Sequence, residues 1–495
     1  MKIRYLWLEI HFIVNPVVFH YPWKTTKDVL FLSCILTNLG VILPRNLTMK
    51  RIVDAYLNQW KIDSNRKPLL LRGARQVGKT HAVRELGKTF EHFVEINFER
   101  NQRALAIFDN DKSLDPRRIL QDIFAINDEK IIPGSTLLFF DEIQIAPRAI
   151  TALRYFYEEM PELHVIAAGS LLDFTIEKIG IPVGRVRSIY MYPLSFIEFM
   201  VALGKKNVVE QLLEKSNFVY SSGVHTDLLD MVGKYLAVGG MPEAVNRWIE
   251  TGNINECLMV HQDIIDTYQQ DFGKYAKASQ IDHVERVFVS IPHQLGGKFK
   301  YTVIEGDYRK RELAPALDLL KTAGIVHKIF HTAAQGIPLG AEVDLDFYKT
   351  MLMDVAISQK ILGLETGSWI VDPLQAFTNK GAVVEAFVGQ EILAYADPRQ
   401  RAQLYYWQRM AKNSTAEVDY LLQDQENIIP IEVKSGQGTT LRSLHMFLET
   451  HARASYGVRF SAQNYSVHDR IHSYPLYAVA QVALQNKEMI LKALL

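Results

Sequence analysis

The sequence has very little cysteine and no excess of charge of either sign. Its 495 residues include two cysteines, Cys34 and Cys257, which excludes a disulfide framework or a zinc site built from cysteines. A reducing, cytoplasmic compartment is therefore expected. Lys plus Arg and Asp plus Glu each number 55, so the formal net charge is zero. A neutral total provides no global attraction to nucleic acid, although it is compatible with a local basic patch.

The sequence also lacks an apolar run that would comfortably span a membrane. The best candidate, residues 29–43, is short and is interrupted by Ser33, Thr37 and Asn38, so no stable membrane insertion is expected. The same run starts too late for a signal peptide and has no small-residue cleavage site. Three interpretations of residues 1–48 stay open: upstream sequence translated before a true start at Met49, an anchor or targeting segment, and a structured extension.

The composition is that of a globular protein with more than one core. Apolar residues make up 48% and charged residues 22% of the chain, which argues against bulk disorder. A chain of this length exceeds one hydrophobic core, so two or three domains are expected. The patterns described below divide the chain into residues 1–48, 49–205, 206–375 and 376–495.

A glycine-rich loop with the spacing G-x-x-x-x-G-K-[ST] follows an apolar run. Residues 68–72 predict a buried strand, and residues 81–88 predict a helix, which is the context that a phosphate-binding loop requires. Two glycines allow successive N–H groups to point at one anion, and the helix start adds its positive dipole end. We therefore expect ATP to bind to Gly73, Ala74, Arg75, Gln76, Val77, Gly78, Lys79, Thr80 and His81.

A second motif, Thr136-Leu-Leu-Phe-Phe-Asp141-Glu142, predicts a buried parallel strand that ends in two carboxylates. In a nucleotide site, Lys79 neutralises the β- and γ-phosphates, while Thr80 and Asp141 hold Mg²⁺. Glu142 orients and polarises the attacking water. Lys79 and Glu142 are therefore predicted to be catalytic, with ATP and Mg²⁺ as the cofactors.

Two further polar positions follow in the same region. Residues 163–170 predict another apolar strand, which ends in Gly-Ser at Ser170. Ser170 can contact the γ-phosphate, it can cap the next helix, or it can do both. Arg185 and Arg187 lie in the next loop and predict an arginine finger in the same or a neighbouring subunit; the alternative is a solvated loop arginine.

Residues 206–375 are mostly helical by periodicity. Residues 311–330 predict a helix, a turn and a strand, an order compatible with a winged helix that contacts DNA or with a plain packing module. No evident arginine cluster stands at base-reading positions.

The last part of the chain carries a candidate second metal site. Residues 383–393 have a helical pattern, and residues 404–407 and 417–422 alternate like paired strands. Asp419 is followed by a hairpin and by Glu432-x-Lys434. Alternation along a strand places Glu432 and Lys434 on one face. Asp419 and Glu432 can hold a metal, with Lys434 positioning a water; a surface hairpin with an ion pair explains the same spacing.

Seven segments of the chain together resemble a known family, over about nine tenths of its length. They are Leu70-Leu-Arg-Gly-Ala-Arg-Gln-Val-Gly-Lys-Thr80, Phe140-Asp-Glu-Ile-Gln144, Ala168-Gly-Ser-Leu-Leu172, Val183-Gly-Arg-Val186, Tyr192-Pro-Leu-Ser-Phe-Ile-Glu-Phe199, Gly239-Gly-Met-Pro-Glu243 and Pro430-Ile-Glu-Val-Lys-Ser-Gly436. The chain is similar to prokaryotic AAA-type ATPases with a C-terminal DUF4143 region, which are related to the archaeal ATPases of the STAND/AAA+ class.

The resemblance implies an α/β fold with three parts. These are a P-loop NTPase domain of the ASCE/AAA+ type with a parallel sheet, a helical and winged-helix-like middle, and a C-terminal α/β domain like the PD-(D/E)xK restriction endonucleases. It assigns Asp419, Glu432 and Lys434 to the nuclease pattern, with Glu385 or Glu391 as the acid on the helix.

Two hypotheses about function follow. In the first, ATP hydrolysis is coupled to a nuclease-like, DNA-binding C-terminal domain, and the chain forms homo-oligomers. In the second, the chain is a slow nucleotide-dependent switch or scaffold that binds protein partners and has no nuclease activity.

Overall fold

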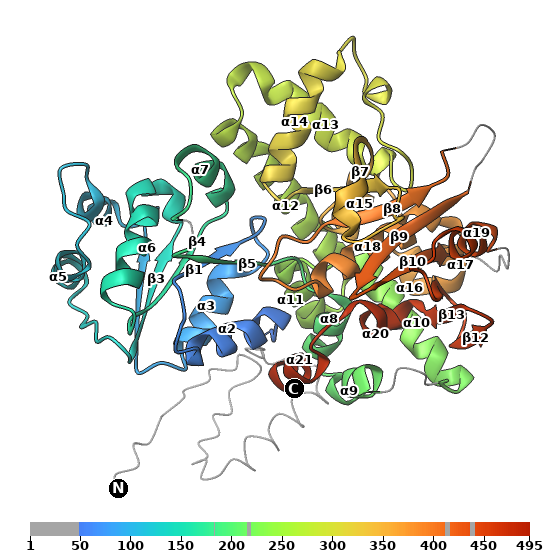
Figure 1. Ribbon diagram of the computed structural model, residues 1–495, viewed down its shortest axis with the longest axis horizontal. Coiled ribbons are helices and arrows are strands. Elements are labelled where there is room, and N and C mark those ends of the chain that lie inside the picture. Colours follow the sequence, from blue (N-terminus) through green and yellow to red (C-terminus); the bar gives the residue numbers. More distant parts are fainter. Residues whose placement is uncertain (1–48, 183, 215–218, 411–415, 436–440) are drawn as a thin grey trace, which may run out of the picture. The chain divides into compact units, whose positions relative to one another are not determined.

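The computed structural model describes residues 49–182, 184–214, 219–410, 416–435 and 441–495 (Figure 1). The interpretations of residues 1–48 lie outside the described residues, as do Val183 and Gly436 of the motifs quoted above. Within the described ranges, no helix has the length and apolar character needed to cross a membrane.

The first region is built on a five-stranded parallel sheet in the order β2-β3-β4-β1-β5. The strand before the glycine loop, β1, is separated from the Asp141 strand, β3, by β4. This confirms the predicted ASCE-type P-loop fold. The strands are β1 (Leu69–Arg72), β2 (His92–Asn97), β3 (Thr136–Asp141), β4 (His164–Ala168) and β5 (Arg187–Tyr190).

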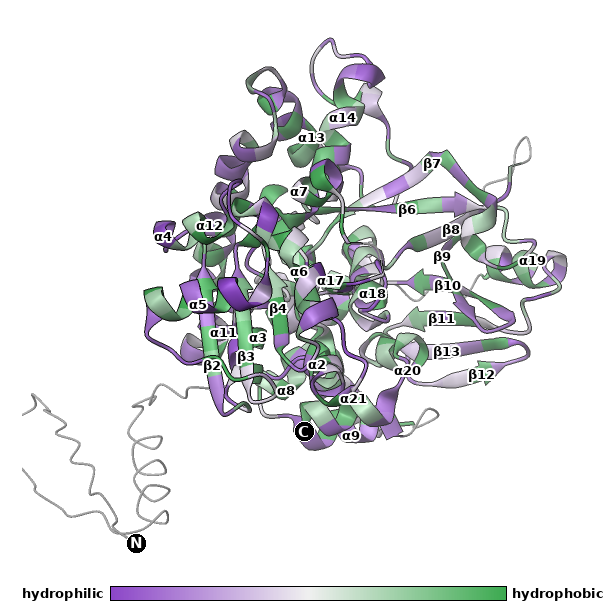
Figure 2. Ribbon diagram, turned by 60° about the vertical axis from the view of Figure 1, so that its left-hand side comes forward, coloured by the Kyte–Doolittle hydropathy of each residue, from purple (hydrophilic) through white to green (hydrophobic). Residues whose placement is uncertain are grey.

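Helices cover both faces of this sheet because successive strand residues point to opposite sides. Leu69 and Leu71 pack in one core with α2 and α3, whereas Leu70 packs in a second core with α5 and α6. Figure 2 shows the apolar strands between these helices. The helices are α2 (Ile52–Ile62), α3 (Lys79–Gly87), α4 (Gln102–Leu105), α5 (Pro116–Asn127), α6 (Pro147–Glu159) and α7 (Leu172–Ile179).

A series of helices follows β5 and starts ahead of residue 206 with α8 (Phe196–Ala202). Ser195 is the N-cap of α8, and its hydroxyl and the Glu198 carboxylate form a capping box. The helices that follow are α9 (Lys206–Glu214), α10 (Ser222–Val238), α11 (Pro242–Thr251), α12 (Ile254–Tyr275), α13 (Ile281–His293), α14 (Lys310–Thr322), α15 (Val355–Ile361), α16 (Ser368–Val371) and α17 (Pro373–Asn379).

A second, mixed sheet has eight strands in the order β12-β13-β11-β10-β9-β8-β6-β7. Its hairpin β6–β7 comes before residue 375, and the other six strands come after it, so one sheet crosses the boundary expected at that position. β6 joins β8 in parallel, with Ile329 opposite Leu404. The strands are β6 (Val326–Thr332), β7 (Val343–Leu352), β8 (Leu404–Gln408), β9 (Glu417–Asp424), β10 (Asn427–Lys434), β11 (Gly457–Ser461), β12 (Ser466–His468) and β13 (Ile471–Pro475).

The C-terminal helices complete the second region and reach back to the first. Helix α18 contacts β10 and β8, and α21 packs against α2. The predicted order of helix, paired strands and hairpin in this part is confirmed, while the domain limits themselves stay predictions. These helices are α18 (Gly381–Tyr395), α19 (Arg442–Thr450), α20 (Val479–Ala483) and α21 (Lys487–Leu494).

Candidate functional site

The predicted nucleotide residues meet at the carboxyl edge of the parallel sheet. The glycine loop follows β1, Asp141 ends β3, and Ser170 follows β4. Asn97 ends β2, the strand next to β3. Because carboxyl ends of parallel strands lie on one edge, side chains from distant parts of the sequence converge there.

The glycine loop has a backbone that only glycine adopts without strain at its two ends. Gly73 has φ 140° and Gly78 has φ 98°, in the region where a Cβ is disfavoured. A Cβ on Gly73 would also collide with the carbonyl oxygen of Met191. Helix α3 starts at Lys79 with no side-chain cap, so the free N–H groups of its first turn, which includes exposed His81, can receive an anion.

Lys79 is held inside the loop. Its ammonium donates hydrogen bonds to the carbonyl oxygens of Gly73, at 2.9 Å, and of Ala74, at 2.7 Å. Burial lowers the pKa of Lys79 to about 8, and the nearby carboxylates of Glu142 and Asp141 oppose that shift. The Lys79 ammonium therefore already lies inside the loop, where a bound phosphate can replace the two carbonyl oxygens as its hydrogen-bond partner.

Thr80, Asp141 and Asn97 form a polar group beside the loop. The Thr80 hydroxyl lies 3.2 Å from Asp141 Oδ2, and Asn97 donates to the same oxygen at 3.1 Å. Burial and the charge of Glu142 raise the pKa of Asp141. A hydroxyl and a carboxylate oxygen are ligands that Mg²⁺ accepts, so these residues fit the expected ion. Asn97 was not predicted, although a polar residue ending a strand was a signal for it.

Glu142 has a left-handed backbone and a restrained side chain. Its φ is 51°, and its Oε2 accepts hydrogen bonds from Gln144 at 2.5 Å and Ser170 at 3.4 Å. The alternative that Ser170 caps the next helix is wrong, because α7 has Leu171 as its N-cap with no side-chain bond. Ser170 instead contacts the carboxylate predicted to orient water.

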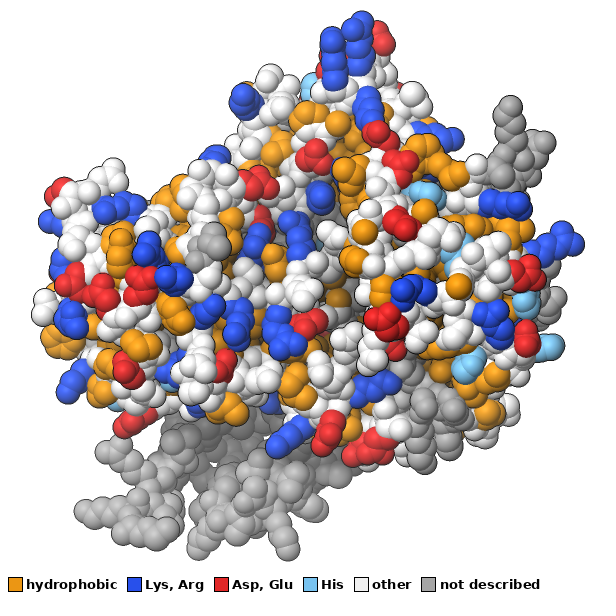
Figure 3. All heavy atoms as spheres, viewed as in Figure 1, with side chains coloured by type: hydrophobic (Ala, Val, Ile, Leu, Met, Phe, Trp, Pro, Cys, Tyr) orange, Lys and Arg blue, Asp and Glu red, His pale blue; other side chains and the backbone are white. Residues whose placement is uncertain are grey.

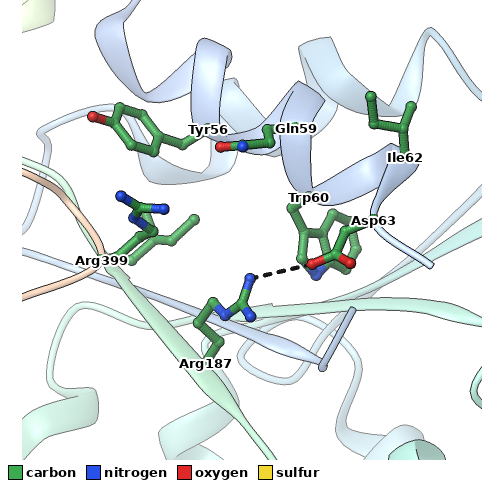
Figure 4. A pocket seen from close by; sticks show the side chains of 8 residues that line it. Tyr56, Gln59, Trp60, Ile62, Asp63, Arg187 and Arg399 are labelled. Atoms are coloured by element: carbon green, nitrogen blue, oxygen red, sulfur yellow. Dashed lines mark ion pairs between the residues drawn. The ribbon is translucent and has the colours of Figure 1, made fainter. Parts of the chain in front are cut away.

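The two loop arginines contact groups outside the glycine loop. Arg185 forms an ion pair with Glu158 of α6 at 2.7 Å. Arg187 lies 3.5 Å from Asp63 and points into a cavity of about 520 Å³ beside α2 and β5, which Arg399 also lines (Figure 4). An arginine finger acting on a neighbouring subunit therefore stays a prediction.

Residues far along the chain hold the glycine loop from outside. On α12, Asp271 forms an ion pair with Arg75 at 2.5 Å, and the Tyr268 hydroxyl donates to the Arg75 carbonyl at 2.9 Å. Buried Arg51 donates to the Val77 carbonyl at 2.9 Å and forms an ion pair with Glu198 at 2.9 Å. The loop is thus connected directly to α12 and, through Arg51, to α8.

The C-terminal residues are also brought together, and they are joined by Lys349 and Glu417, which the sequence did not indicate. Asp419 accepts a hydrogen bond from the Val433 N–H at 2.7 Å, and Lys434 donates to Glu432 at 2.6 Å. Lys349 of β7 forms ion pairs with Glu385 at 2.9 Å and Glu417 at 2.5 Å. We call Lys349, Glu385, Glu417, Asp419, Glu432 and Lys434 the carboxylate cluster.

The structure separates the two candidates for the acid on α18. Glu385 belongs to the carboxylate cluster, whereas Glu391 accepts a hydrogen bond from the Phe196 N–H at 2.9 Å and so caps α8. Glu391 is therefore a structural link between α18 and α8.

A metal does not fit the carboxylate cluster as it is built. Among the residues that the structure describes, no group of three or more His, Cys, Asp or Glu side chains is arranged to hold a metal ion. The ammonium of Lys349 already lies against two of the carboxylates. A metal ion at the second site predicted at Asp419 and Glu432 would therefore compete with the ammonium of Lys349.

Comparison with known proteins identifies three regions of the chain. Residues 65–200 match the model of an AAA domain. Residues 229–368 match DUF8612 and residues 380–479 match DUF4143, both described as domains of unknown function. A search of curated proteins finds no significant match.

Among solved structures, three similar chains have low identity. A Walker-type ATPase of Pyrococcus abyssi has 14% identity and a TM-score of 0.39, over 65% of this chain and 97% of that one. The Drosophila ORC bound to DNA has 15% identity and a TM-score of 0.25, over 71% and 96%. A STAND protein of Pyrococcus horikoshii with a tetratricopeptide repeat sensor has 12% identity and a TM-score of 0.24, over 72% and 50%.

The family matches agree with the resemblance drawn from the motifs. Residues 65–200 thus form a P-loop domain of the AAA type, and the chain continues through a DUF8612 region into a C-terminal DUF4143 region.

Proposed function

We propose that the chain binds ATP with Mg²⁺ and hydrolyses it at the carboxyl edge of the five-stranded sheet. The observation that carries this proposal is the convergence of the Lys79 ammonium, the Thr80 hydroxyl and the Asp141 carboxylate around a glycine loop. Phosphoryl transfer needs mainly positioning and charge stabilisation, and these groups supply both. The low cysteine content favours a cytoplasmic location.

Each residue has a distinct role in this scheme. The loop N–H groups and Lys79 bind the phosphates, and Lys79 exchanges its carbonyl partners for phosphate oxygens. Thr80 and Asp141 would hold Mg²⁺, which would supply neutralisation of the phosphate charge. Asn97 holds the Asp141 carboxylate. Glu142 orients the attacking water, and Ser170 is the candidate sensor of the γ-phosphate.

Two substitutions in the full-length chain test this proposal. Lys79→Ala removes the phosphate-binding charge, so nucleotide affinity measured by calorimetry should fall at least 100-fold. Glu142→Gln should keep the affinity and lower kcat by about 100-fold, because it removes a group expected to act mainly in the transition state. Wild-type turnover by Glu142→Gln would disprove the role of Glu142.

We further propose that the nucleotide state is coupled to the C-terminal region, with DNA as the partner. Contacts through Arg51, Glu198 and Glu391 join the glycine loop to α18. Lys and Arg side chains gather at the upper tip in Figure 3, and Arg309, Lys310 and Arg311 at the start of α14 are exposed. Such side chains can contact phosphates without reading bases.

DNA coupling is tested by steady-state ATPase rates with and without duplex and single-stranded DNA at two salt concentrations. The expected result is a stimulation of severalfold that weakens at the higher salt. Arg311→Ala should reduce the stimulation without changing the basal rate. A rate that ignores both kinds of DNA would contradict this coupling.

A slow switch that binds protein partners, with or without assembly into homo-oligomers, is the second candidate function. The contact of Gln144 with Glu142 favours it, because a carboxylate oxygen already bonded to an amide is not free to orient the attacking water. A switch would bind nucleotide tightly, turn over very slowly and show no response to DNA. If Arg185 or Arg187 acts on a neighbouring subunit, activity per chain will rise with protein concentration.

A further inference from the structure

Lys349 lies in the interior of the carboxylate cluster. Its side chain is 2% exposed, and its ammonium contacts Glu385 of α18 and Glu417 of β9. Three elements that are distant in the sequence therefore meet at one positive charge. The ring of Tyr406, 5.2 Å away, covers another side of the ammonium. A buried lysine either loses its proton or has its charge paired, and the charge of Lys349 is paired.

The cluster is rich in negative charge beyond these two ion pairs. The charge of Asp419 acts on Lys349 and also raises the pKa of Glu385 and Glu432. Burial is the main cause of both shifts, which bring the pKa of Glu385 to about 8 and that of Glu432 to about 7. The four carboxylates thus share Lys349 and Lys434 as their cations.

The backbone fixes the position of Lys349. Strand β7 pairs along its length with β6, and Lys349 lies opposite Ile329. An isolated bridge with Lys298 holds the other side of the strand. The backbone pairing therefore holds Lys349 on β7 in reach of α18 and β9, and an ammonium that left the cluster would leave its carboxylates with one cation fewer.

We propose that Lys349 is the resident cation of the carboxylate cluster, standing where a nuclease-like site would hold a divalent metal. The DUF4143 region then folds without metal and acts as a binding module that does not cleave phosphodiesters. An incoming divalent ion would meet the same carboxylates together with a like charge held between them. This proposal is independent of the ATPase activity, because the cluster shares no residue with the nucleotide site.

One observation favours the opposite outcome and shapes the experiment. Within the described residues, Glu432 Oε2 is buried and has no hydrogen-bond partner, while Lys434 occupies the other oxygen. A free carboxylate oxygen is a ligand for a cation. Mn²⁺ therefore serves as the probe, and Glu432 is substituted together with Lys349.

The test is Mn²⁺ binding to the nucleotide-free, full-length chain, measured by electron paramagnetic resonance of the free ion. Wild type should not bind Mn²⁺ at the cluster, so wild type and Glu432→Gln should give the same Mn²⁺ titration. Lys349→Met keeps the volume and removes the charge, so it should bind Mn²⁺ at least tenfold more tightly than wild type. The double substitution Lys349→Met with Glu385→Gln should lose that gain, which locates the ion in the cluster.

If Lys349→Met folds poorly, melting temperatures measured in EDTA and in Mn²⁺ provide a second test of metal binding. The metal should raise the melting temperature of Lys349→Met and leave wild type and the charge-preserving Lys349→Arg unchanged. No gain for Lys349→Met, or wild-type binding that Glu432→Gln abolishes, would overturn the proposal. As a functional readout, wild type and Asp419→Ala should both leave supercoiled plasmid intact in Mg²⁺ or Mn²⁺.

Discussion

At the scale of single residues, burial decides the chemistry of Lys79. The ammonium is buried in its own loop, and this lowers its pKa to about 8, below the value of a free lysine. The charged form is therefore penalised in the folded state below pH 8. The penalty disappears as pH rises from about 8 toward the unfolded value of 10.5, so this group makes the nucleotide-free fold relatively more stable over that range.

The same shift predicts how nucleotide affinity depends on pH. Because phosphate binding needs the ammonium, the affinity for ADP should be flat below about pH 7.5 and fall above pH 8, by up to about tenfold per unit. Calorimetric titrations between pH 7 and 9.5 measure this. Lys79→Arg keeps its charge over the range, so its affinity, although weaker, should not show the fall. A wild-type affinity independent of pH would contradict a charge requirement.

The contact of Gln144 with Glu142 leads to a second prediction, which concerns the rate of hydrolysis. The Gln144 amide bonds to the carboxylate of Glu142, and a hydrogen bond to a charged group is worth about 1.5–3 kcal/mol. Gln144→Ala should free the carboxylate and raise the basal kcat about fivefold, with little change in KM. A decrease in kcat would mean that Gln144 holds Glu142 in its productive orientation.

At the scale of elements, α12 acts as a support for the glycine loop. Tyr268 and Asp271 lie about one turn apart on this helix and contact the backbone and the side chain of Arg75. Because both contacts are to the loop itself, changes in α12 should reach the phosphates without any change in the loop's sequence.

Substitutions on α12 should therefore affect nucleotide affinity. Tyr268→Phe leaves the Arg75 carbonyl without its donor, at a cost of about 1 kcal/mol, and should weaken nucleotide binding about fivefold. Lys274→Ala is the matched control: Lys274 pairs with the same Asp271 and is half exposed, so its loss should have little effect. Equal effects of the two substitutions on calorimetric affinity would argue against support by α12.

The elements also show what the sequence could and could not predict. Local patterns were enough for β1, β3, the glycine loop and the β9–β10 hairpin, because each depends on neighbouring residues. Asn97, Asp271 and Lys349 were missed, since their roles depend on contacts with residues 44, 196 and 36 positions away. A lone polar residue carries no local sign of its tertiary partner.

At the scale of the whole described molecule, Glu391 connects two regions that the sequence suggests are separate. It is fully buried, and burial raises its pKa to about 8. Because the folded pKa lies above the unfolded value of 4.5, the stability contributed by the protonated acid is complete below about pH 4.5. It is lost as pH rises through 8.

Two substitutions distinguish the titration of Glu391 from its role as hydrogen-bond acceptor for the Phe196 N–H. Glu391→Gln keeps an acceptor for Phe196 N–H and removes the titration, so the free energy of unfolding should vary less with pH than in wild type. Glu391→Ala removes the acceptor and should destabilise the chain by about 1–3 kcal/mol at every pH. Urea unfolding at pH 5.5 and 8.5 measures both, and an identical pH dependence in wild type and Glu391→Gln would rule out this titration.

The eight-stranded sheet limits how the chain can be divided. The β6–β7 hairpin comes from the region matched by DUF8612, yet it pairs with β8 of the following region. A gene fragment that begins near residue 376 would leave the β8 edge uncovered, and an uncovered edge is a template for aggregation. For the same reason, a natural loss of the C-terminal region at that point would remove six of the eight strands of the shared sheet, so these two regions are expected to be inherited together.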